Sequence, residues 1–89
     1  MLEHSVEIIN KLGLHARAAA KFVTLASAFD AEILIDYNGQ QVNGKSIMGV
    51  MMLAAGKGAT IHLEIDGPDE EQASQALLEL INNRFDESE

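Results

Sequence analysis

Cysteine and tryptophan are both absent from this chain of 89 residues. Without cysteine there is no disulfide scaffold, no thiolate metal site and no cysteine nucleophile, and a reducing intracellular environment is expected. Cations are also scarce, because six Lys and Arg oppose fourteen Asp and Glu and give a formal net charge of −8. Nucleic-acid binding depends on cations that neutralise phosphates, so we do not expect nucleic acid as a partner.

Long hydrophobic runs are missing as well. No stretch approaches the roughly 20 apolar residues of a membrane-spanning helix. The first residues contain neither the basic segment nor the apolar run of a secretory signal. We therefore expect a cytoplasmic protein with no membrane partner. A hydrophobic fraction of 47% with 22% charged residues is typical of a folded domain, and the length predicts one domain over residues 1–89.

The charge is distributed unevenly along the chain. Residues 1–57 carry five cations and five anions, whereas residues 58–89 carry one cation and nine anions. The stretch 8–29 contains no acid at all but includes Lys11, Arg17 and Lys21. Such a pattern is also what an ordinary solvated surface produces. We interpret it as two surfaces, one suited to phosphate and an acidic partner and one that holds the excess negative charge.

The spacing of apolar residues predicts the order strand, helix, strand, strand, helix, strand, helix. Strands are indicated by two-residue alternation or β-forming residues, and helices by apolar steps of three and four. We therefore predict an α+β fold in which a four-stranded, largely antiparallel sheet carries three helices on one face. The last residues, 86–89, have nothing to bury and are expected to fray. The predicted strands are 2–9, 32–37, 40–43 and 60–66, and the predicted helices are 16–29, 47–53 and 69–81.

His15 is the principal candidate for chemistry. It precedes the first turn of the helix predicted from Ala16, where unpaired backbone N–H groups and a partial positive charge favour an anion. The N–H groups of Ala16, Arg17 and Ala18 are the candidate donors. A phosphoryl group on the imidazole would lie over them, with the Arg17 guanidinium as a charged clamp. His15 could equally be an ordinary exposed residue at a helix start.

The other two histidines are expected to be structural. His4 shares a face of the first strand with Val6 and Ile8 and could be partly buried, whereas His62 should face solvent, and neither has a basic neighbour within two residues. The spacing of the three histidines does not suggest a metal site.

Ser46 admits two interpretations. As a helix N-cap it needs no further function. As a phosphorylation site it would place a dianion beside Lys45, which is favourable within the domain and repulsive to an acidic partner. The apolar segment that follows Ser46 is too short to bury all of its methionines, and exposed methionine suits the docking of several partners.

Two motifs support a family resemblance: Gly13–Arg17 (GLHAR) and Gly44–Met51 (GKSIMGVM). Together they closely resemble the HPr family of histidine phosphocarriers of the bacterial phosphotransferase system. Residues 7–13 and 82–86 look most like the nitrogen-related NPr type. The family pattern usually has proline after the arginine, where this chain has Ala18, and we predict a more mobile first turn with the transfer chemistry retained.

The resemblance implies an open-faced β-sandwich and a phosphoryl carrier rather than an enzyme, without cofactor or metal. His15 would accept a phosphoryl group on Nδ1 from a phosphorylated histidine of enzyme I, itself charged by phosphoenolpyruvate. It would then pass the group to an enzyme IIA domain, while Arg17 helps to hold it. In part of the family a dedicated serine kinase phosphorylates the residue equivalent to Ser46. We expect a monomer, with partner contacts at Lys21, Ile47, Met48, Met51 and Met52.

Two other functions are considered. An acyl carrier protein is also small, acidic and modified on a serine, but that family is all-helical with Asp before the serine, where this chain has Lys45. A regulatory module of the same fold that binds proteins without obligatory phosphotransfer is the main alternative, and the presence of both His15 and Arg17 argues against it.

Overall fold

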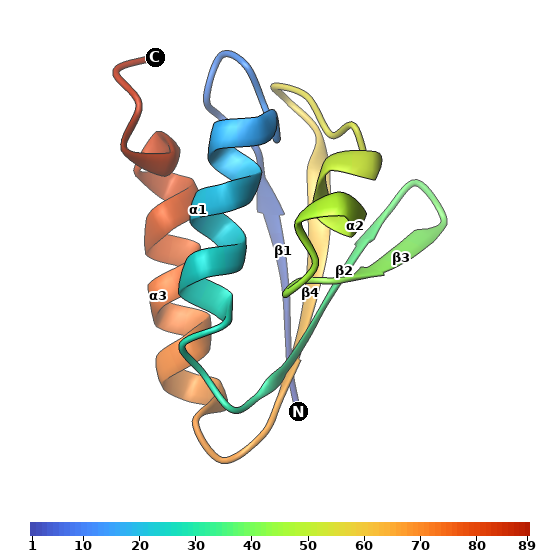
Figure 1. The fold of residues 1–89 in the computed structure, drawn as a ribbon, viewed down its shortest axis with the longest axis vertical. Coiled ribbons are helices and arrows are strands. Elements are labelled where there is room, and N and C mark those ends of the chain that lie inside the picture. Colours follow the sequence, from blue (N-terminus) through green and yellow to red (C-terminus); the bar gives the residue numbers. More distant parts are fainter.

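The computed structural model describes residues 1–89 as two layers, a sheet and a set of helices on one of its faces (Figure 1). Helices α1 and α3 lie side by side over the sheet, and α2 lies on the other side of α1. None of these helices has the length and hydrophobicity needed to cross a bilayer. The strands are β1 (Leu2–Glu7), β2 (Glu32–Tyr37), β3 (Gln40–Asn43) and β4 (Thr60–Asp66); the helices are α1 (Ala16–Ala26), α2 (Ile47–Met52), α3 (Glu70–Asn82) and a short turn, η1 (Arg84–Asp86).

The sheet has the order β1-β4-β2-β3, and every neighbouring pair is antiparallel. Val6 of β1 lies opposite Ile61 of β4, and Leu63 of β4 lies opposite Ile35 of β2, so the buried positions are in register across the sheet. With three helices on that face, this arrangement confirms the predicted α+β class and its βαββαβα order.

One hydrophobic core lies between the two layers. It is a cluster of 20 buried residues. Ile33 and Leu63 from the sheet and Phe22, Leu77 and Ile81 from the helices are all fully buried. Burial of the apolar sheet face and the helix stripes is the main stabilising contribution in a chain of this size.

Two predicted boundaries differ from the structure by two residues or more, and all the others agree to within one residue. β1 ends at Glu7 and not at residue 9, although Ile8 still donates its N–H to Ala59 O and accepts one from Gly58. α1 ends at Ala26 and not at residue 29, because the N–H of Phe29 bonds the carbonyl of Ala26, three residues back. Such three-residue bonds tighten the end of a helix into a turn while the side chain of Phe29 still packs on the core.

The prediction that the last residues fray was wrong. Phe85 is fully buried beneath the turn η1, and the Glu87 side chain that follows is only 15% exposed. The buried phenyl ring anchors the chain just before the acidic residues, so they are held against the body of the protein. As Figure 1 shows, this places the C-terminal segment at the same end of the molecule as the start of α1.

Candidate functional site

A tight loop between β1 and α1 positions His15. Gly13 adopts a positive φ of 67°, and Leu14 donates its N–H to Ala55 O at 2.9 Å. The fully buried Asn10 donates through Nδ2 to Gly13 O at 2.9 Å, which closes the loop from within. The chain then enters α1 with His15 as the N-cap residue, and the His15 carbonyl accepts the N–H of Ala19 at 2.8 Å.

The His15 side chain does not cap the helix. It is 28% exposed, makes no hydrogen bond to the first turn, and lines an open surface depression of about 580 Å³. Leu12, which the sequence reasoning did not single out, is 65% exposed beside it. The depression is lined by Lys11, Leu12, His15, Ala16, Arg17, Glu87, Ser88 and Glu89.

The predicted phosphate-binding groups are only partly brought together. Arg17 is exposed and makes no ion pair or side-chain hydrogen bond, so its guanidinium is free to bind an anion. The N–H groups of Ala16, Arg17 and Ala18 have no hydrogen-bond partner, as expected for the first turn of a helix. Ala16 and Arg17 line the depression, whereas Ala18 is fully buried and does not.

Glu87 is the residue at this site that sequence reasoning missed. His15 Nε2 lies 2.5 Å from Glu87 Oε2, and Asn10 Nδ2 donates to Glu87 Oε1 at 3.1 Å. Burial raises the pKa of this carboxyl, but the hydrogen bonds from His15 and Asn10 outweigh it and hold the pKa below its ordinary value. A carboxylate can only accept, so we assign the shared proton to His15 Nε2, which leaves a lone pair on Nδ1.

The interpretation of two separate charged surfaces also needs correction. The stretch 8–29 is free of acids in the sequence, but the folded tail brings Glu87 and Glu89 into the depression beside Lys11 and Arg17. Lys11 pairs with Glu89 at 3.5 Å. Cations and carboxylates are therefore mixed around His15, because residues more than seventy positions apart in the sequence meet there.

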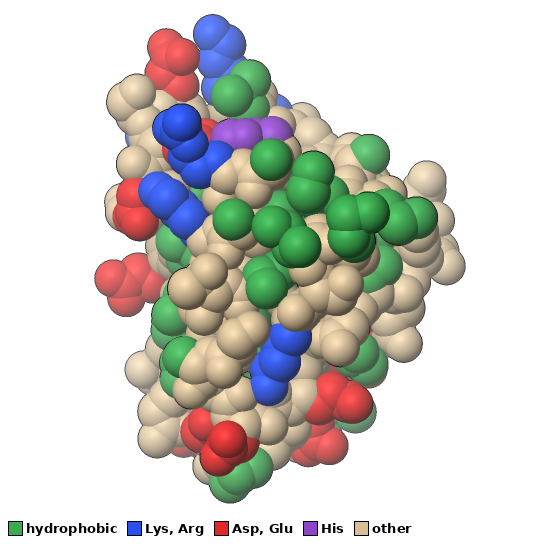
Figure 2. Space-filling view, in the orientation of Figure 1, with side chains coloured by type: hydrophobic (Ala, Val, Ile, Leu, Met, Phe, Trp, Pro, Cys, Tyr) green, Lys and Arg blue, Asp and Glu red, His purple; other side chains and the backbone are tan.

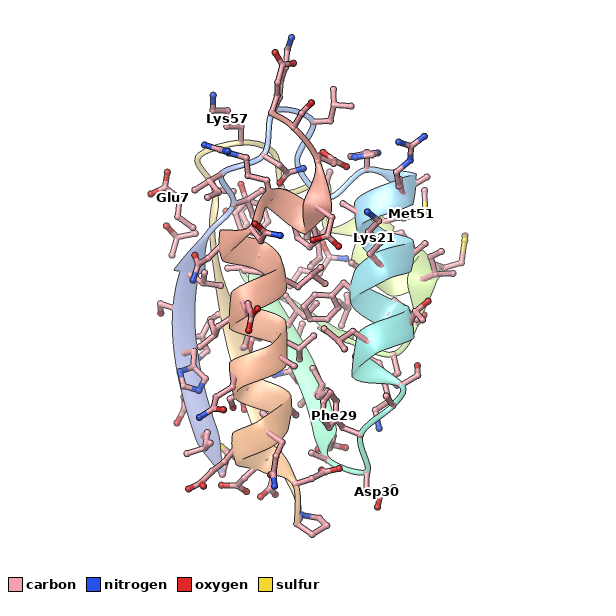
Figure 3. The ribbon with its side chains drawn as sticks, turned by 90° about the vertical axis from the view of Figure 1, so that its left-hand side faces the viewer. Glu7, Lys21, Phe29, Asp30, Met51 and Lys57 are labelled. Atoms are coloured by element: carbon pink, nitrogen blue, oxygen red, sulfur yellow. The ribbon has the colours of Figure 1, made fainter.

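Lys21, predicted as a docking contact, is turned toward the C-terminal turn. Its Nζ donates to the carbonyl of Phe85 at 2.9 Å and lies 3.9 Å from Asp86 Oδ2. In Figure 3 the side chain lies on the side of α1 that faces α3 and the turn. About a third of the side chain remains exposed, and its docking role stays a prediction.

Ser46 is the N-cap of α2. Its Oγ accepts the N–H of Gly49 at 3.1 Å, which satisfies one donor of the first helical turn and confirms the predicted cap. The residue is only half-buried, so its use as a cap does not conflict with a modification site.

The large apolar side chains of α2 remain on the surface. Ile47 is 42% exposed, Met48 67%, Met51 39% and Met52 65%. The space-filling view shows exposed hydrophobic side chains gathered at this end of the molecule beside a histidine, with Lys and Arg side chains on its other side (Figure 2). The short helix therefore presents an apolar surface next to the depression.

The remaining histidines lie apart from the depression. His62, on the outer face of the sheet, contacts Ser5 Oγ through Nδ1 at 3.2 Å and Glu3 Oε1 through Nε2 at 3.0 Å. His4 is half-buried on the opposite face, and its Nε2 has no partner. Both side chains belong to the packing and surface of the sheet.

The fold and the depression together define a small open-faced β-sandwich protein that presents one histidine and an unpaired arginine at an open surface depression. Residues 2–83 match the family model described as PTS HPr component phosphorylation site. The phosphocarrier protein HPr of Cupriavidus necator is 61% identical over 89 residues, which is 100% of both chains. This chain belongs to the HPr family of the phosphotransferase system, and it is a phosphoryl carrier rather than an enzyme.

Solved structures agree with this assignment. A crystal structure of HPr from Thermoanaerobacter tengcongensis matches with a TM-score of 0.96 at 46% identity and covers 100% of both chains. An HPr dimer from the same organism matches with a TM-score of 0.78 at 47% identity, covering 98% of this chain and 100% of that one. Dimers therefore exist among the structural neighbours, and the expectation of a monomer stays a prediction.

Proposed function

We propose that His15 accepts a phosphoryl group on Nδ1 from the phosphorylated histidine of enzyme I and passes it to an enzyme IIA domain. The observation that carries this proposal is the contact between His15 Nε2 and the Glu87 carboxylate. Because Nε2 holds the proton, Nδ1 keeps the lone pair that a nucleophile needs. Glu87 thus determines which of the two ring nitrogens is reactive, and the open depression gives a partner access to that nitrogen.

The transfer step needs no group beyond these residues and the donor. The Nδ1 lone pair forms the new bond to phosphorus as the bond between phosphorus and the donor nitrogen breaks, and that electron pair returns to the donor ring. The His15 ring becomes positively charged while Nε2 keeps its proton, so the Glu87 carboxylate stabilises the product. Onward transfer is the reverse process, in which the ring leaves as neutral imidazole.

Arg17 and the helix start hold the transferred phosphoryl group. The guanidinium has no carboxylate partner, and the N–H groups of Ala16 and Arg17 are unpaired at the rim of the depression. Interactions of an anion with a helix N-terminus contribute about 0.3–2 kcal/mol. That modest magnitude suits a carrier, which must release the group it accepts.

Partner docking is proposed for the exposed apolar surface of α2. Ile47, Met48, Met51 and Met52 are exposed on the short helix that packs against α1, and flexible methionine side chains can adapt to different partners. The same surface would serve enzyme I and enzyme IIA in turn. Phosphorylation of Ser46 by a serine kinase would place a dianion at the edge of this surface and repel acidic partners.

The finer assignments are proposals as well. We treat residues 1–89 as one domain, which the single core cluster supports. The nitrogen-related type rests only on the resemblance of residues 7–13 and 82–86. A cytoplasmic location is proposed from membership of a family that works in the cytoplasm.

Incubation with phosphoenolpyruvate and catalytic enzyme I tests the phosphocarrier proposal. We expect a stoichiometric, acid-labile phosphoryl adduct in the wild-type protein, and none in His15→Ala. His62→Ala is the matched control and should label like the wild type, because His62 lies on the outer face of the sheet. Absence of label in the wild type, or label that survives His15→Ala, would contradict the proposal and favour a regulatory protein-binding module.

A further inference from the structure

The turn that carries Glu87 to the site has an unusual backbone. Arg84, Phe85 and Asp86 have φ values of 56°, 53° and 63°, so three consecutive non-glycine residues occupy the left-handed region. L-residues visit that region as single residues, because the Cβ crowds the following carbonyl. A run of three persists only where surrounding contacts determine it.

Two contacts tie this turn to the body of the protein. The phenyl ring of Phe85 is fully buried, and its carbonyl accepts the Lys21 Nζ at 2.9 Å. This is the only hydrogen bond between α1 and residues 84–86, since the turn's other hydrogen bonds lie within residues 83–87. The Lys21 charge also lies 3.9 Å from Asp86 Oδ2, so the ammonium contacts the turn at two neighbouring residues, with a hydrogen bond to one and an ion pair to the other.

The turn fixes the chain on the N-terminal side of Glu87, and on the C-terminal side the Glu89 carbonyl accepts the N–H of Lys11 at 3.0 Å. The Glu87 N–H bonds the carbonyl of Arg84 at 2.9 Å, so the backbone of Glu87 follows directly from the left-handed turn. Its side chain then reaches Asn10 and His15. Displacement of the turn would lengthen the contact to His15 Nε2, because only two side-chain torsions separate the Glu87 Cα from the carboxyl carbon Cδ and few rotations are available to compensate.

We propose that Lys21 is a positioning residue for His15, which acts through the left-handed turn 84–86 and Glu87 to keep the imidazole proton on Nε2. The proposal rests on the proposed function of His15, since the reactive nitrogen matters only if the ring accepts a group. The other charged groups around the ring are Lys11, Arg17 and Glu89, and none of them bonds the turn.

Four single variants test the proposal. Lys21→Met keeps the aliphatic stem and removes the ammonium, whereas Lys21→Arg keeps a cationic donor. Lys45→Met is the matched control, because Lys45 Nζ also donates to a backbone carbonyl, that of Phe29, at 2.7 Å. Glu87→Gln removes the carboxylate itself. The readouts are the ¹⁵N shifts of the His15 ring, which report the tautomer, and amide exchange of residues 84–89.

In Lys21→Met we expect the Glu87 amide to exchange at least about tenfold faster and the His15 ring to move toward the mixed tautomer expected in Glu87→Gln. Lys21→Arg should restore the wild-type spectrum, and Lys45→Met should leave it unchanged. In the Glu87→Gln background, Lys21→Met should have no further effect on the ring, because Lys21 acts through Glu87.

A wild-type His15 spectrum in Lys21→Met, or an equal change in Lys45→Met, would overturn the proposal. An effect of Lys21→Met that persists undiminished in the Glu87→Gln background would also overturn it. The ring spectra need no phosphoryl donor, so they separate this proposal from the first. If the wild type is not phosphorylated but the tautomer depends on Lys21, the proposed function fails and the positioning role stands.

Discussion

Substitution of Gly13 by alanine should disturb the loop that presents His15. Gly13 has a φ of 67°, and a Cβ there would lie 2.6 Å from both Ala55 O and Gly56 Cα. Both obstacles are backbone atoms, so no side chain can rotate away. The Ala55 carbonyl also accepts the N–H of Leu14, and a shift that relieves the contact stretches this bond.

The magnitude follows from these two effects. A non-glycine residue in the left-handed region costs about 1–2 kcal/mol, and a weakened backbone hydrogen bond costs about 0.5–1.5 kcal/mol. We therefore expect Gly13→Ala to lower the free energy of unfolding by about 1.5–3.5 kcal/mol, a Tm decrease of about 6–28 °C. A domain of this length has about 4–13 kcal/mol in total, so the variant should still fold.

Alanine substitutions at two other glycines separate the conformational cost of a positive φ from the cost of the steric clash. An added Cβ at Gly56 or Gly58 meets nothing within 4 Å, and only Gly58 has a positive φ, of 90°. Gly56→Ala should be close to neutral, Gly58→Ala should show the conformational cost alone, and Gly13→Ala should exceed both. Urea denaturation followed by circular dichroism gives the three values. The reasoning is refuted if Gly13→Ala costs no more than Gly58→Ala. If Gly13→Ala is phosphorylated more slowly than wild type while Gly56→Ala and Gly58→Ala are not, the steric clash at Gly13 disturbs the His15 site.

Three further predictions concern single side chains. Ala18→Pro should raise the free energy of unfolding by about 0.4–1 kcal/mol, because the Ala18 N–H has no acceptor to lose, and a lower free energy of unfolding in urea titration would contradict this. A phosphorylation rate more than about a hundredfold higher in the same variant would contradict the prediction that the transfer chemistry is retained with Ala18. Glu87→Gln should be less stable than wild type at neutral pH, with the difference vanishing as pH falls through the lowered pKa of Glu87; an unchanged difference in acid would disprove this. Ser46→Ala should cost about 1 kcal/mol through the lost bond to Gly49 N, whereas Ser27→Ala, which caps nothing by its side chain, should be near neutral.

The features that the sequence predicted correctly are those set by near neighbours. Alternation over 60–66 defines the buried face of β4, because side chains in a strand alternate between faces. The Ser46 cap depends on a donor three residues away. The place of His15 at the start of α1 likewise depends on the glycine before it and the alanines after it. Each pattern is contained in a short window, so the sequence predicted it.

What the sequence did not predict depends on contacts across the fold. Nothing near residue 87 distinguishes Glu87 from the other acids of the tail, since its role arises from meeting Asn10 and His15 at the far end of the chain. The one available signal was Phe85, because a large apolar residue just before an acidic end needs somewhere to be buried. That signal predicts an anchored tail but does not identify which carboxylate reaches the histidine.

The folded tail also changes what the net charge of −8 means for the site. At physiological ionic strength charges are screened beyond about 8 Å, and the molecule measures 33 by 27 by 20 Å, so an approaching phosphoryl group responds mainly to the depression. There Lys11 and Arg17 face Glu87 and Glu89, and the formal charges balance before any group arrives. A purely cationic pocket would hold a phosphoryl dianion firmly. A pocket with balanced charges stabilises the dianion weakly, and Arg17, which has no carboxylate partner, remains available to hold it. Weak binding of the dianion allows the protein to pass the phosphoryl group on.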